Sequence, residues 1–441
     1  MKTISSHKIA EILNCKSEIK YAEINGVSTD SRNCSENDVF IAVKGETFDG
    51  HNFVKDVVKN GCPLVVVNHI IDDIPENMQI VVEDTLDAYG KIGAYNRSLF
   101  NGKVIGLTGS SGKTTTKEEI KFLLSKFKKT YATKGNHNNF IGVPESLCNL
   151  DMSADYAIIE MGMSAKGEIS RLTSYVKPDI AIVTNVYPMH IEFFENFEGI
   201  AHAKSEIFES MTSVGIAIIN EDTNFADILQ AKAKKYTDNI MKFGKNSKPD
   251  ADFETNAEGQ HYMYNAWCAL RVVEALGLDI KKAAEFVKDF EALDGRGKHH
   301  KLKLADGNFY TLIDDSYSGQ PEAMKIAIET LDKIKTNNRK IVVLGKMAEL
   351  GRFSDENHVK IGKTLDKTDI DVVIGVCPEM KAMLSCILSN KEKYYFENKD
   401  KVAEFLLNNL LQKDDIVLIK GARYSSKLYQ VAEELINKGK Q

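Results

Sequence analysis

Short apolar runs alternate with helical stretches from residue 103 onward, and this alternation limits the possible folds more than any other feature of the sequence. The first four runs lie at residues 104–108, 156–160, 180–185 and 215–220, and each ends in a polar or glycine-rich turn. Nearly continuous apolar runs are typical of parallel strands that helices cover on both faces. The accompanying helices are expected near residues 112–128, 200–212, 262–276 and 280–289. The sequence therefore predicts an α/β fold built on a parallel sheet.

The alternation restarts after the turn-rich segment Asp294-Gly295-Arg296-Gly297, which we interpret as a domain boundary. Strands are expected near residues 310–314, 340–344, 371–375 and 415–419, with helices near 321–334, 355–366, 399–412 and 426–438. Residues 1–98 form a smaller α/β unit, with strands near 38–43, 62–67 and 80–82 and a helix near 52–59. We expect three domains, at residues 1–98, 99–294 and 295–441, the last being a doubly wound, Rossmann-like sheet.

Composition excludes several classes of protein. The chain has 441 residues, and roughly 150 residues per domain also suggests about three domains. The net charge of −6 lacks the basic surplus of a nucleic-acid coat protein. The longest apolar stretches, such as residues 63–67, are far below the roughly 18 residues of a membrane span, and the N-terminus lacks the apolar core of a secretory signal. Seven cysteines without a C-x-x-C pair do not indicate disulfides or a thiolate zinc site. We expect a cytoplasmic protein that neither binds nucleic acid nor inserts into membranes.

A glycine-rich segment between an expected strand and an expected helix carries the strongest chemical motif. It runs from Gly106 to Thr116 and contains Gly109-Ser110-Ser111-Gly112-Lys113-Thr114-Thr115. Backbone N–H groups of such a loop close around phosphate oxygens, Lys113 can reach the β- and γ-phosphates, and the Thr114 hydroxyl can ligate magnesium. The strict G-x-x-x-x-G-K-[ST] spacing is not met, because Leu107 stands five residues before Gly112. The alternative is a glycine turn that opens a helix without binding phosphate.

Two further segments carry groups suited to hold a metal ion. Glu160 ends a buried strand at the edge of the sheet where ligands of such folds bind, although a strand-end acid is often merely solvated or a helix cap. Segment 184–192 contains His190, and Ala203-Lys204-Ser205-Glu206-Ile207 contains Lys204. A single histidine or lysine is more often structural or exposed. Only the order of the surrounding motifs indicates that these two residues have a function.

That order resembles the Mur ligase superfamily, the ATP-dependent enzymes that form amide bonds in peptidoglycan precursors. Residues 108–115 are similar to its T-G-[ST]-x-G-K-T-T loop, which accounts for the unusual spacing. Residues 160–162, 184–190 and 203–207 resemble its strand-end glutamate, its T-N-x-x-x-x-H segment and its A-K-x-E-I segment, whose lysine the family carbamylates. The resemblance spans nearly the whole chain and implies a three-domain architecture whose central domain is a P-loop ATPase-type parallel sheet.

The resemblance also implies the cofactors and the roles of individual residues. ATP would bind with two Mg²⁺ ions, one held by Thr114 and Glu160 and the other by Glu160, His190 and the carbamylated Lys204. A carbamate replaces the repelling ammonium by an anionic oxygen that suits a hard cation. Lys113, Glu160, His190 and Lys204 would form the catalytic group. The nucleotide would further contact His261 and Asn265, which lie in segment 259–265. It would also contact Arg296 and Asp315 of the third domain.

Three regions indicate which branch of the family the chain resembles. Residues 26–32 and 43–51 look like a domain that binds a UDP-sugar, which the folate-using relatives lack; the implied contacts are Ser28, Thr29, Asp30, Ser31, Arg32, Lys44 and Asp49. Residues 134–144 are similar to the G-N-x-N-N-x-x-G-x-P segment of the branch that adds D-alanyl-D-alanine, with Asn138 and Asn139 as implied substrate contacts. Residues 315–321 match the D-S-Y-x-x-x-P spacing of the same branch. The expected substrates are UDP-N-acetylmuramoyl-tripeptide and D-alanyl-D-alanine, and we expect a monomer.

The sequence departs from the pattern of that branch where the amine should bind. The usual D-S-Y-N-A-N-P appears as Asp315-Ser316-Tyr317-Ser318-Gly319-Gln320-Pro321, and Tyr317, Ser318 and Gln320 are the expected contacts. The usual L-G-D-M-x-E-L-G contains Lys346 in place of the aspartate. Two alternatives follow: a ligase of the same chemistry with another amine acceptor or acyl carrier, or a catalytically silent, nucleotide-dependent regulatory relative. Retention of the expected phosphate and metal contacts favours an enzyme.

Overall fold

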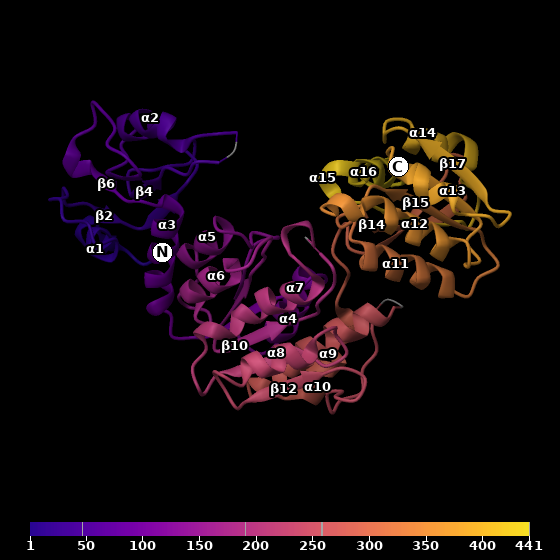
Figure 1. Ribbon diagram of the computed structural model, residues 1–441, viewed down its shortest axis with the longest axis horizontal. Helices are drawn as coiled ribbons and strands as arrows, with labels where there is room; N and C mark the ends of the chain where they lie inside the picture. The colour runs from indigo at the N-terminus through magenta and orange to yellow at the C-terminus, as the bar shows by residue number, and fades with distance from the viewer. Residues whose placement is uncertain (46, 190, 257–258, 441) are drawn as a thin grey trace.

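The chain forms three lobes in sequence order, each with a sheet of its own (Figure 1). The computed structural model describes residues 1–45, 47–189, 191–256 and 259–440. No helix within these ranges is long and apolar enough to cross a membrane.

The first lobe contains a small parallel sheet with the strand order β3-β4-β5-β6. Its strands are β3 (Gly26–Ser28), β4 (Asp38–Ile41), β5 (Leu64–Val67) and β6 (Gln79–Val81), and a short antiparallel pair, β1 (Ile4–Ser5) and β2 (Glu23–Ile24), lies beside it. The helices are α1 (Ser6–Ile12), α2 (Val54–Lys59) and α3 (Thr85–Ser98). Asp84 caps α3, which packs against α5 and α6 of the next lobe and so joins the two.

The second lobe contains the central sheet, in which six parallel strands follow the order β12-β11-β10-β7-β9-β8. They are β7 (Lys103–Thr108), β8 (Thr130–Ala132), β9 (Tyr156–Glu160), β10 (Ile180–Val183), β11 (Ile216–Asn220) and β12 (Ile240–Phe243). Helices α5 (Gly142–Cys148), α6 (Glu168–Val176), α7 (Phe197–Ser205) and α8 (Ala226–Ala233) cover one face. Helices α4 (Lys113–Leu124), α9 (Gln260–Ala275) and α10 (Ile280–Glu285) cover the other.

The third lobe contains a second six-stranded sheet, with the order β13-β14-β18-β15-β16-β17. The strands are β13 (Lys298–Lys303), β14 (Phe309–Asp315), β15 (Lys340–Gly345), β16 (Val372–Val376), β17 (Glu392–Phe396) and β18 (Ile416–Lys420). Helices α11 (Pro321–Lys333), α12 (Ser354–Leu365) and α13 (Met380–Ser385) pack on one face, and α14 (Val402–Phe405) and α16 (Leu428–Gly439) on the other. A short helix, α15 (Arg423–Ser426), follows β18.

The structure confirms the predicted α/β class with parallel sheets and corrects several details. Strand β13 runs antiparallel to β14 and was not expected, because its sequence Lys-His-His-Lys-Leu-Lys has a single apolar residue; the charged edge suits a strand with no further neighbour. The predicted helix 112–128 ends at Leu124. The predicted helix 200–212 begins earlier, at Phe197, and continues as a 3₁₀-helix from Glu206. The predicted helix 399–412 ends in a π-helical turn.

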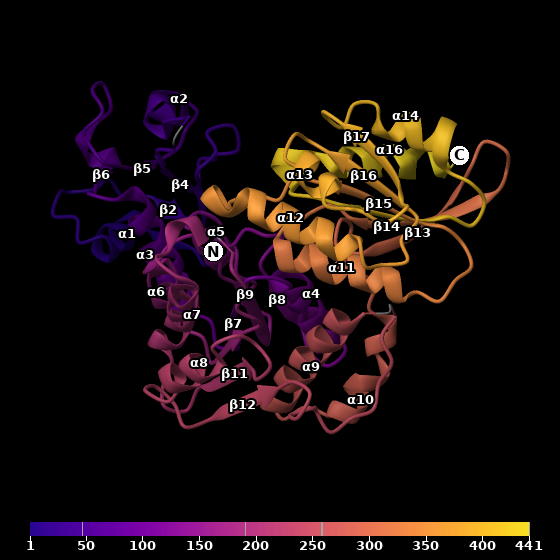
Figure 2. The ribbon, with the colours of Figure 1, turned by 45° about the vertical axis from the view of Figure 1, so that its right-hand side comes forward.

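The segment that joins the second and third lobes is fastened to the start of the third sheet. Gly295 and Gly297 adopt φ angles of +73° and +86°, which favour glycine. Their N–H groups donate to the Asp314 carboxylate and carbonyl, at 2.9 and 2.8 Å. Figure 2 shows α11 of the third lobe facing α4 and α9 of the second. The carboxyl ends of the strands β7, β9 and β14 thus border one space between the lobes.

Candidate active site

The glycine-rich segment forms a loop between β7 and α4. Ser110 N–H donates to the Asn185 carbonyl at 3.0 Å and Ser111 N–H to the Asn185 side chain at 2.8 Å, so the loop is fixed to the end of the neighbouring strand β10. A Cβ on Gly109 would stand 1.9 Å from Thr184 Oγ1, and Gly112 has a φ of +74°. Lys113 begins α4, and its Nζ donates to the Gly109 carbonyl at 2.8 Å, which folds the side chain back over the loop. This is the arrangement expected of a phosphate-binding loop.

Glu160 lies beside this loop, because β9 pairs with β7. The side chain is 1% exposed, and its Oε1 accepts hydrogen bonds from Thr114 Oγ1 at 3.2 Å and from Asn138 Nδ2 at 2.7 Å. Its Oε2 accepts no hydrogen bond from the described residues and lies 3.8 Å from the Nζ of Lys117. A buried carboxylate oxygen without a donor is suited to bind a cation.

Lys204 is buried on the neighbouring helix α7, with 1% of its surface exposed. Burial and the positive charge of Lys113 hold the pKa of Lys204 well below its usual value of 10.5. Burial also lowers the pKa of Lys113, as does the charge of Arg296. The fourth expected member of the group, His190, lies outside the described residues.

Two of the cavities at this edge are lined by the phosphate loop, and the larger of them has a volume of about 580 Å³ and lies between α4, α9 and α11. The expected nucleotide contacts Ser111, Gly112, Thr115, His261, Asn265, Arg296 and Asp315 all line it. Asn265 Oδ1 accepts a hydrogen bond from Thr116 Oγ1 at 3.0 Å. Burial lowers the pKa of His261 to about 4, with a smaller effect of Lys420, so the imidazole is neutral at physiological pH.

Aromatic and charged side chains border the same cavity from α9 and from the third sheet. Tyr264 donates its hydroxyl to Asp222 at 2.6 Å and packs edge-on against Trp267, with 5.0 Å between ring centroids. Lys420, on β18, donates to Asp315 at 2.6 Å. Burial raises the pKa of Asp315, while Lys420 acts in the opposite direction.

A smaller cavity of about 290 Å³ adjoins the phosphate loop on the side of Glu160. Residues 110–114 line it, as do Asn138, Asn139 and Phe140 of the loop before α5, and Arg296, Tyr317 and Ser318 of the third lobe. The guanidinium of Arg296 lies 4.0 Å from the centroid of the Tyr317 ring. Gln320 lies at the border of the third lobe with segment 187–189 instead, next to Ser110 and Ser111. The expected acyl, phosphate and amine contacts therefore meet in one space, with Gln320 at its margin.

The expected UDP-sugar contacts gather at one edge of the first sheet. Residues 28–32 follow β3 and residues 44–49 follow β4, and these two strands are parallel neighbours. Arg32 donates to the Asp30 carboxylate at 2.9 and 2.7 Å, and Ser28 Oγ donates to the Asp30 carbonyl. Lys44 Nζ lies 3.8 Å from Asp49. Within the described ranges, no residue of 1–98 lines the two cavities between the other lobes.

The structure adds site residues that the sequence analysis missed. Asn185 shapes the phosphate loop, Lys420 pairs with Asp315, and the buried Lys117 contacts the loop before α5. Asn185 lies within segment 184–190 and Lys117 directly follows the glycine-rich segment, so their positions next to motifs could have indicated a role in the site. Lys420 ends an apolar strand run, and nothing local distinguishes it from a solvated lysine.

Three family descriptions match consecutive parts of the chain. "Mur ligase family, catalytic domain" matches residues 23–92, "Mur ligase middle domain" residues 107–273, and "Mur ligase, glutamate ligase domain" residues 301–423.

Individual relatives match over the full length. The UDP-N-acetylmuramoyl-tripeptide–D-alanyl-D-alanine ligase of Rickettsia prowazekii is 31% identical, with 90% of this chain and 92% of the relative covered. The Escherichia coli enzyme of the same name is 30% identical over 100% of both chains. A crystal structure of MurF from Acinetobacter baumannii superposes with a TM-score of 0.89 at 31% identity, covering 99% of this chain and 100% of that one. The MurF ligase of Thermotoga maritima in complex with ADP has a TM-score of 0.81 at 28% identity, covering 94% and 97%. The matches in sequence, the shared three-domain fold and the loop geometry agree: this chain belongs to the Mur ligase family.

Proposed function

We propose that this protein is an ATP-dependent, ADP-forming ligase that joins D-alanyl-D-alanine to UDP-N-acetylmuramoyl-tripeptide in peptidoglycan precursor synthesis. The smaller cavity carries the proposal, because phosphate-loop residues, the loop with Asn138 and Asn139, and the third-lobe residues Tyr317 and Ser318 line one space. A reaction that brings together a phosphoryl group, a carboxylate and an amine needs such a junction. The names of the full-length relatives support the same substrates.

The three units at residues 1–98, 99–294 and 295–441 divide the work in this proposal. The first binds the UDP-sugar through residues 28–32, Lys44 and Asp49, the second binds ATP, and the third supplies Arg296 and Asp315 to the nucleotide and Tyr317, Ser318 and Gln320 to the amine. In this proposal the active form is a monomer.

In this proposal two Mg²⁺ ions bind beside Glu160. The free Oε2 of Glu160 and the hydroxyl of Thr114 are hard oxygen donors in a buried setting. Lys204 fits a carbamate, because only a neutral amine reacts with CO₂ and burial favours the neutral form of this side chain. Glu160, His190 and the carbamate on Lys204 would hold the second ion. Bound there, the ions would neutralise charge that gathers on the phosphoryl oxygens.

The residues of the chain orient the reactants and exclude water. The terminal carboxylate of the tripeptide attacks the γ-phosphorus of ATP, which gives an acyl phosphate and ADP. The dipeptide amine then displaces inorganic phosphate and loses a proton as the amide forms. Lys113 and the loop N–H groups stabilise the phosphoryl charge, and the third lobe covers the cavity, which protects the acyl phosphate from hydrolysis.

Product formation and phosphate release test the proposal together. With ATP and Mg²⁺, phosphate release should require both UDP-N-acetylmuramoyl-tripeptide and D-alanyl-D-alanine, and mass spectrometry should find the pentapeptide product. Release without either substrate would indicate a nucleotide switch. Efficient ligation of another amine, with none of D-alanyl-D-alanine, would contradict the acceptor assignment.

A further inference from the structure

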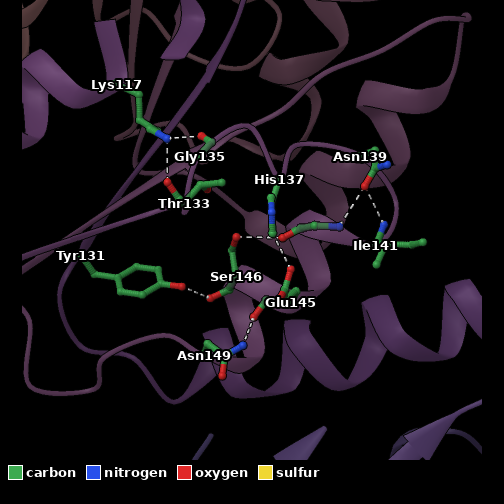
Figure 3. Close-up of polar contacts among 11 residues, drawn as sticks. Lys117, Tyr131, Thr133, Gly135, His137, Asn139, Ile141, Glu145, Ser146 and Asn149 are labelled. Carbon is green, nitrogen blue, oxygen red and sulfur yellow. Dashed lines mark hydrogen bonds and ion pairs between the residues drawn. The ribbon is translucent and has the colours of Figure 1, made fainter. Parts of the chain in front are cut away.

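Lys117 is a fully buried lysine on α4, one turn after Lys113. Its Nζ donates to the carbonyls of Thr133 at 2.6 Å and Gly135 at 2.5 Å (Figure 3). It also lies 3.0 Å from Glu118 Oε1 and 3.8 Å from Glu160 Oε2. An ammonium that is removed from water is costly unless its donors are satisfied. These contacts satisfy it, and they also tie the helix of the phosphate loop to the segment that follows β8.

That segment, residues 133–141, is the loop that lines the smaller cavity, and it is fastened at both ends. At its far end, Asn139 Oδ1 accepts from the N–H groups of Ile141 and Gly142, and His137 contacts Glu145 at 2.7 Å (Figure 3). At its near end, Thr133 N–H donates to the Ile158 carbonyl of β9, and Lys117 binds the two carbonyls. Gly135 has a φ of +55°, and no atom lies within 4 Å of the position that a Cβ would occupy. Packing of side chains therefore does not hold this part of the loop in place.

Asn138 lies between these two fastenings and touches the catalytic centre. Its Nδ2 donates to Glu160 Oε1 at 2.7 Å, and its carbonyl accepts from Gly162 N–H at 2.8 Å. A Cβ on Gly162 would lie 2.7 Å from Asn138 Oδ1, so the approach is close. A shift of the near end of the loop would therefore move Asn138 relative to Glu160 and to Lys113.

We propose that Lys117 is a positioning residue of the ligation reaction. Its ammonium sets the spacing between the helix that begins with Lys113 and Thr114 and the loop that presents Asn138 and Asn139. The distance between the phosphoryl-binding side and the acyl-binding side of the smaller cavity is thereby held constant. The inference rests on the proposed function, since it assumes that these two sides hold ATP and the tripeptide. A misplacement of about 1 Å can lower a rate about 100-fold, so a remote ammonium can control turnover.

Lys117→Met tests the proposal, because it removes the donors and keeps most of the volume. Lys391→Met is a control matched in its acceptors: the half-buried Lys391 also binds two carbonyls, those of Thr368 and Ile370, in the third lobe. We expect both variants to unfold at lower temperature. Only Lys117→Met should raise the KM for UDP-N-acetylmuramoyl-tripeptide, by about tenfold or more, and lower kcat, while the KM for ATP changes by less than about threefold. A Lys117→Met enzyme with wild-type kcat and KM would show that the residue only supports the fold.

A second variant covers the case in which Lys117→Met does not fold. Lys117→Gln retains an N–H donor with a shorter reach, and its effect on kcat/KM should be less than additive with that of Asn138→Ala, because both act through one loop. Additive effects would overturn the proposal.

Amide hydrogen exchange provides a readout that needs no turnover. In Lys117→Gln, peptides that cover residues 134–140 should exchange faster, whereas α4 should remain protected. Unchanged exchange in that loop would contradict the positioning role. Absence of ligation by the wild-type protein would instead contradict the proposed function and leave the exchange result to decide on Lys117.

Discussion

The central sheet and the third sheet are both six-stranded and doubly wound, yet the charges at the ends of their strands are paired differently. In the third lobe, buried or half-buried charges are paired: Lys420 with Asp315 at 2.6 Å, Arg339 with Asp415 at 2.7 Å and Lys346 with Glu379 at 2.5 Å. In the described part of the central lobe, the Oε2 of Glu160 at the end of β9 accepts no hydrogen bond, and Lys117 Nζ lies 3.8 Å from it.

The difference shows which lobe is completed by its ligands. A buried unpaired charge reduces stability, so it persists where a bound group of opposite sign compensates it. Phosphates near Lys113 and cations near Glu160 would provide that compensation. The paired charges of the third lobe need no ligand to compensate them, which suits a rigid lobe that carries the proposed amine site.

The largest effect is expected at the phosphate loop. Lys113→Met removes the cation that reaches the phosphoryl group but leaves the hydrophobic core intact, so kcat should fall by at least about 10³-fold with little change in melting temperature. Steady-state kinetics and calorimetry measure the two quantities. Retention of more than about a tenth of the wild-type rate would contradict the assignment of the loop to ATP.

Lys204→Ala should lower kcat about 100-fold or more, because it removes the side chain that would carry the carbamate. Added acetate should restore part of the activity by placing a carboxylate where the carbamate would lie. Lys113→Met serves as the control, since acetate should not revive it. Full activity of Lys204→Ala without additive would refute the carbamate hypothesis.

In the third lobe, Lys420→Met should destabilise the fold by about 1–3 kcal/mol, because the half-buried Asp315 loses its partner. Adding Asp315→Asn should recover most of that loss, which denaturant titration would detect. An equal loss in the double variant would mean that Lys420 acts through packing rather than through the pair.

Glu119 tests whether burying an acidic side chain outside the two cavities lowers stability. Burial raises its pKa from 4.5 to about 8, so between these pH values the folded state binds more protons than the unfolded state, and stability falls as the pH rises. Glu119→Gln should abolish that fall and raise the unfolding free energy at pH 8 by about 1–3 kcal/mol. The exposed Glu285→Gln is the control and should have no such effect. A wild-type stability that does not fall between pH 5 and 8 would contradict the raised pKa of Glu119.

The smallest effect is expected at the amine site. Restoring both asparagines, as Ser318→Asn with Gln320→Asn, should change the KM for D-alanyl-D-alanine only modestly, since uncharged hydrogen bonds contribute about 0.5–1.5 kcal/mol each. Ser318 lines both cavities, whereas Gln320 lies at their margin, so Ser318→Asn alone should account for most of the change. A gain in kcat/KM beyond about tenfold would instead favour another natural acceptor.

Sequence reasoning predicted the interior of the fold better than its edges. Strands β7, β9, β10 and β15 are buried on both faces, so continuous apolar runs indicated them. Edge strands such as β13 and β17 expose charged or aromatic side chains, and β8 has three half-buried residues, so no run of that kind exists.

The site residues likewise fall into those that a local motif indicates and those that it does not. Lys113, Thr114 and Glu160 lie together because a motif places each at the end of a strand or the start of a helix. The contacts of Lys117 with Thr133 and of Lys420 with Asp315 join segments 16 and 105 residues apart, and no local pattern encodes them. The role of His190 stays a prediction.

Trp267 gives the protein an optical property that follows from its position. It is the single tryptophan of the chain, it is 7% exposed, and it touches Tyr264, which lines the larger cavity. The ammonium of Lys248 lies 5.8 Å from the centroid of its ring. All tryptophan fluorescence of the 441-residue chain therefore comes from this one indole, which lies next to the wall of the larger cavity that is expected to face the adenine. The wavelength and intensity of that fluorescence report on this wall without any added label.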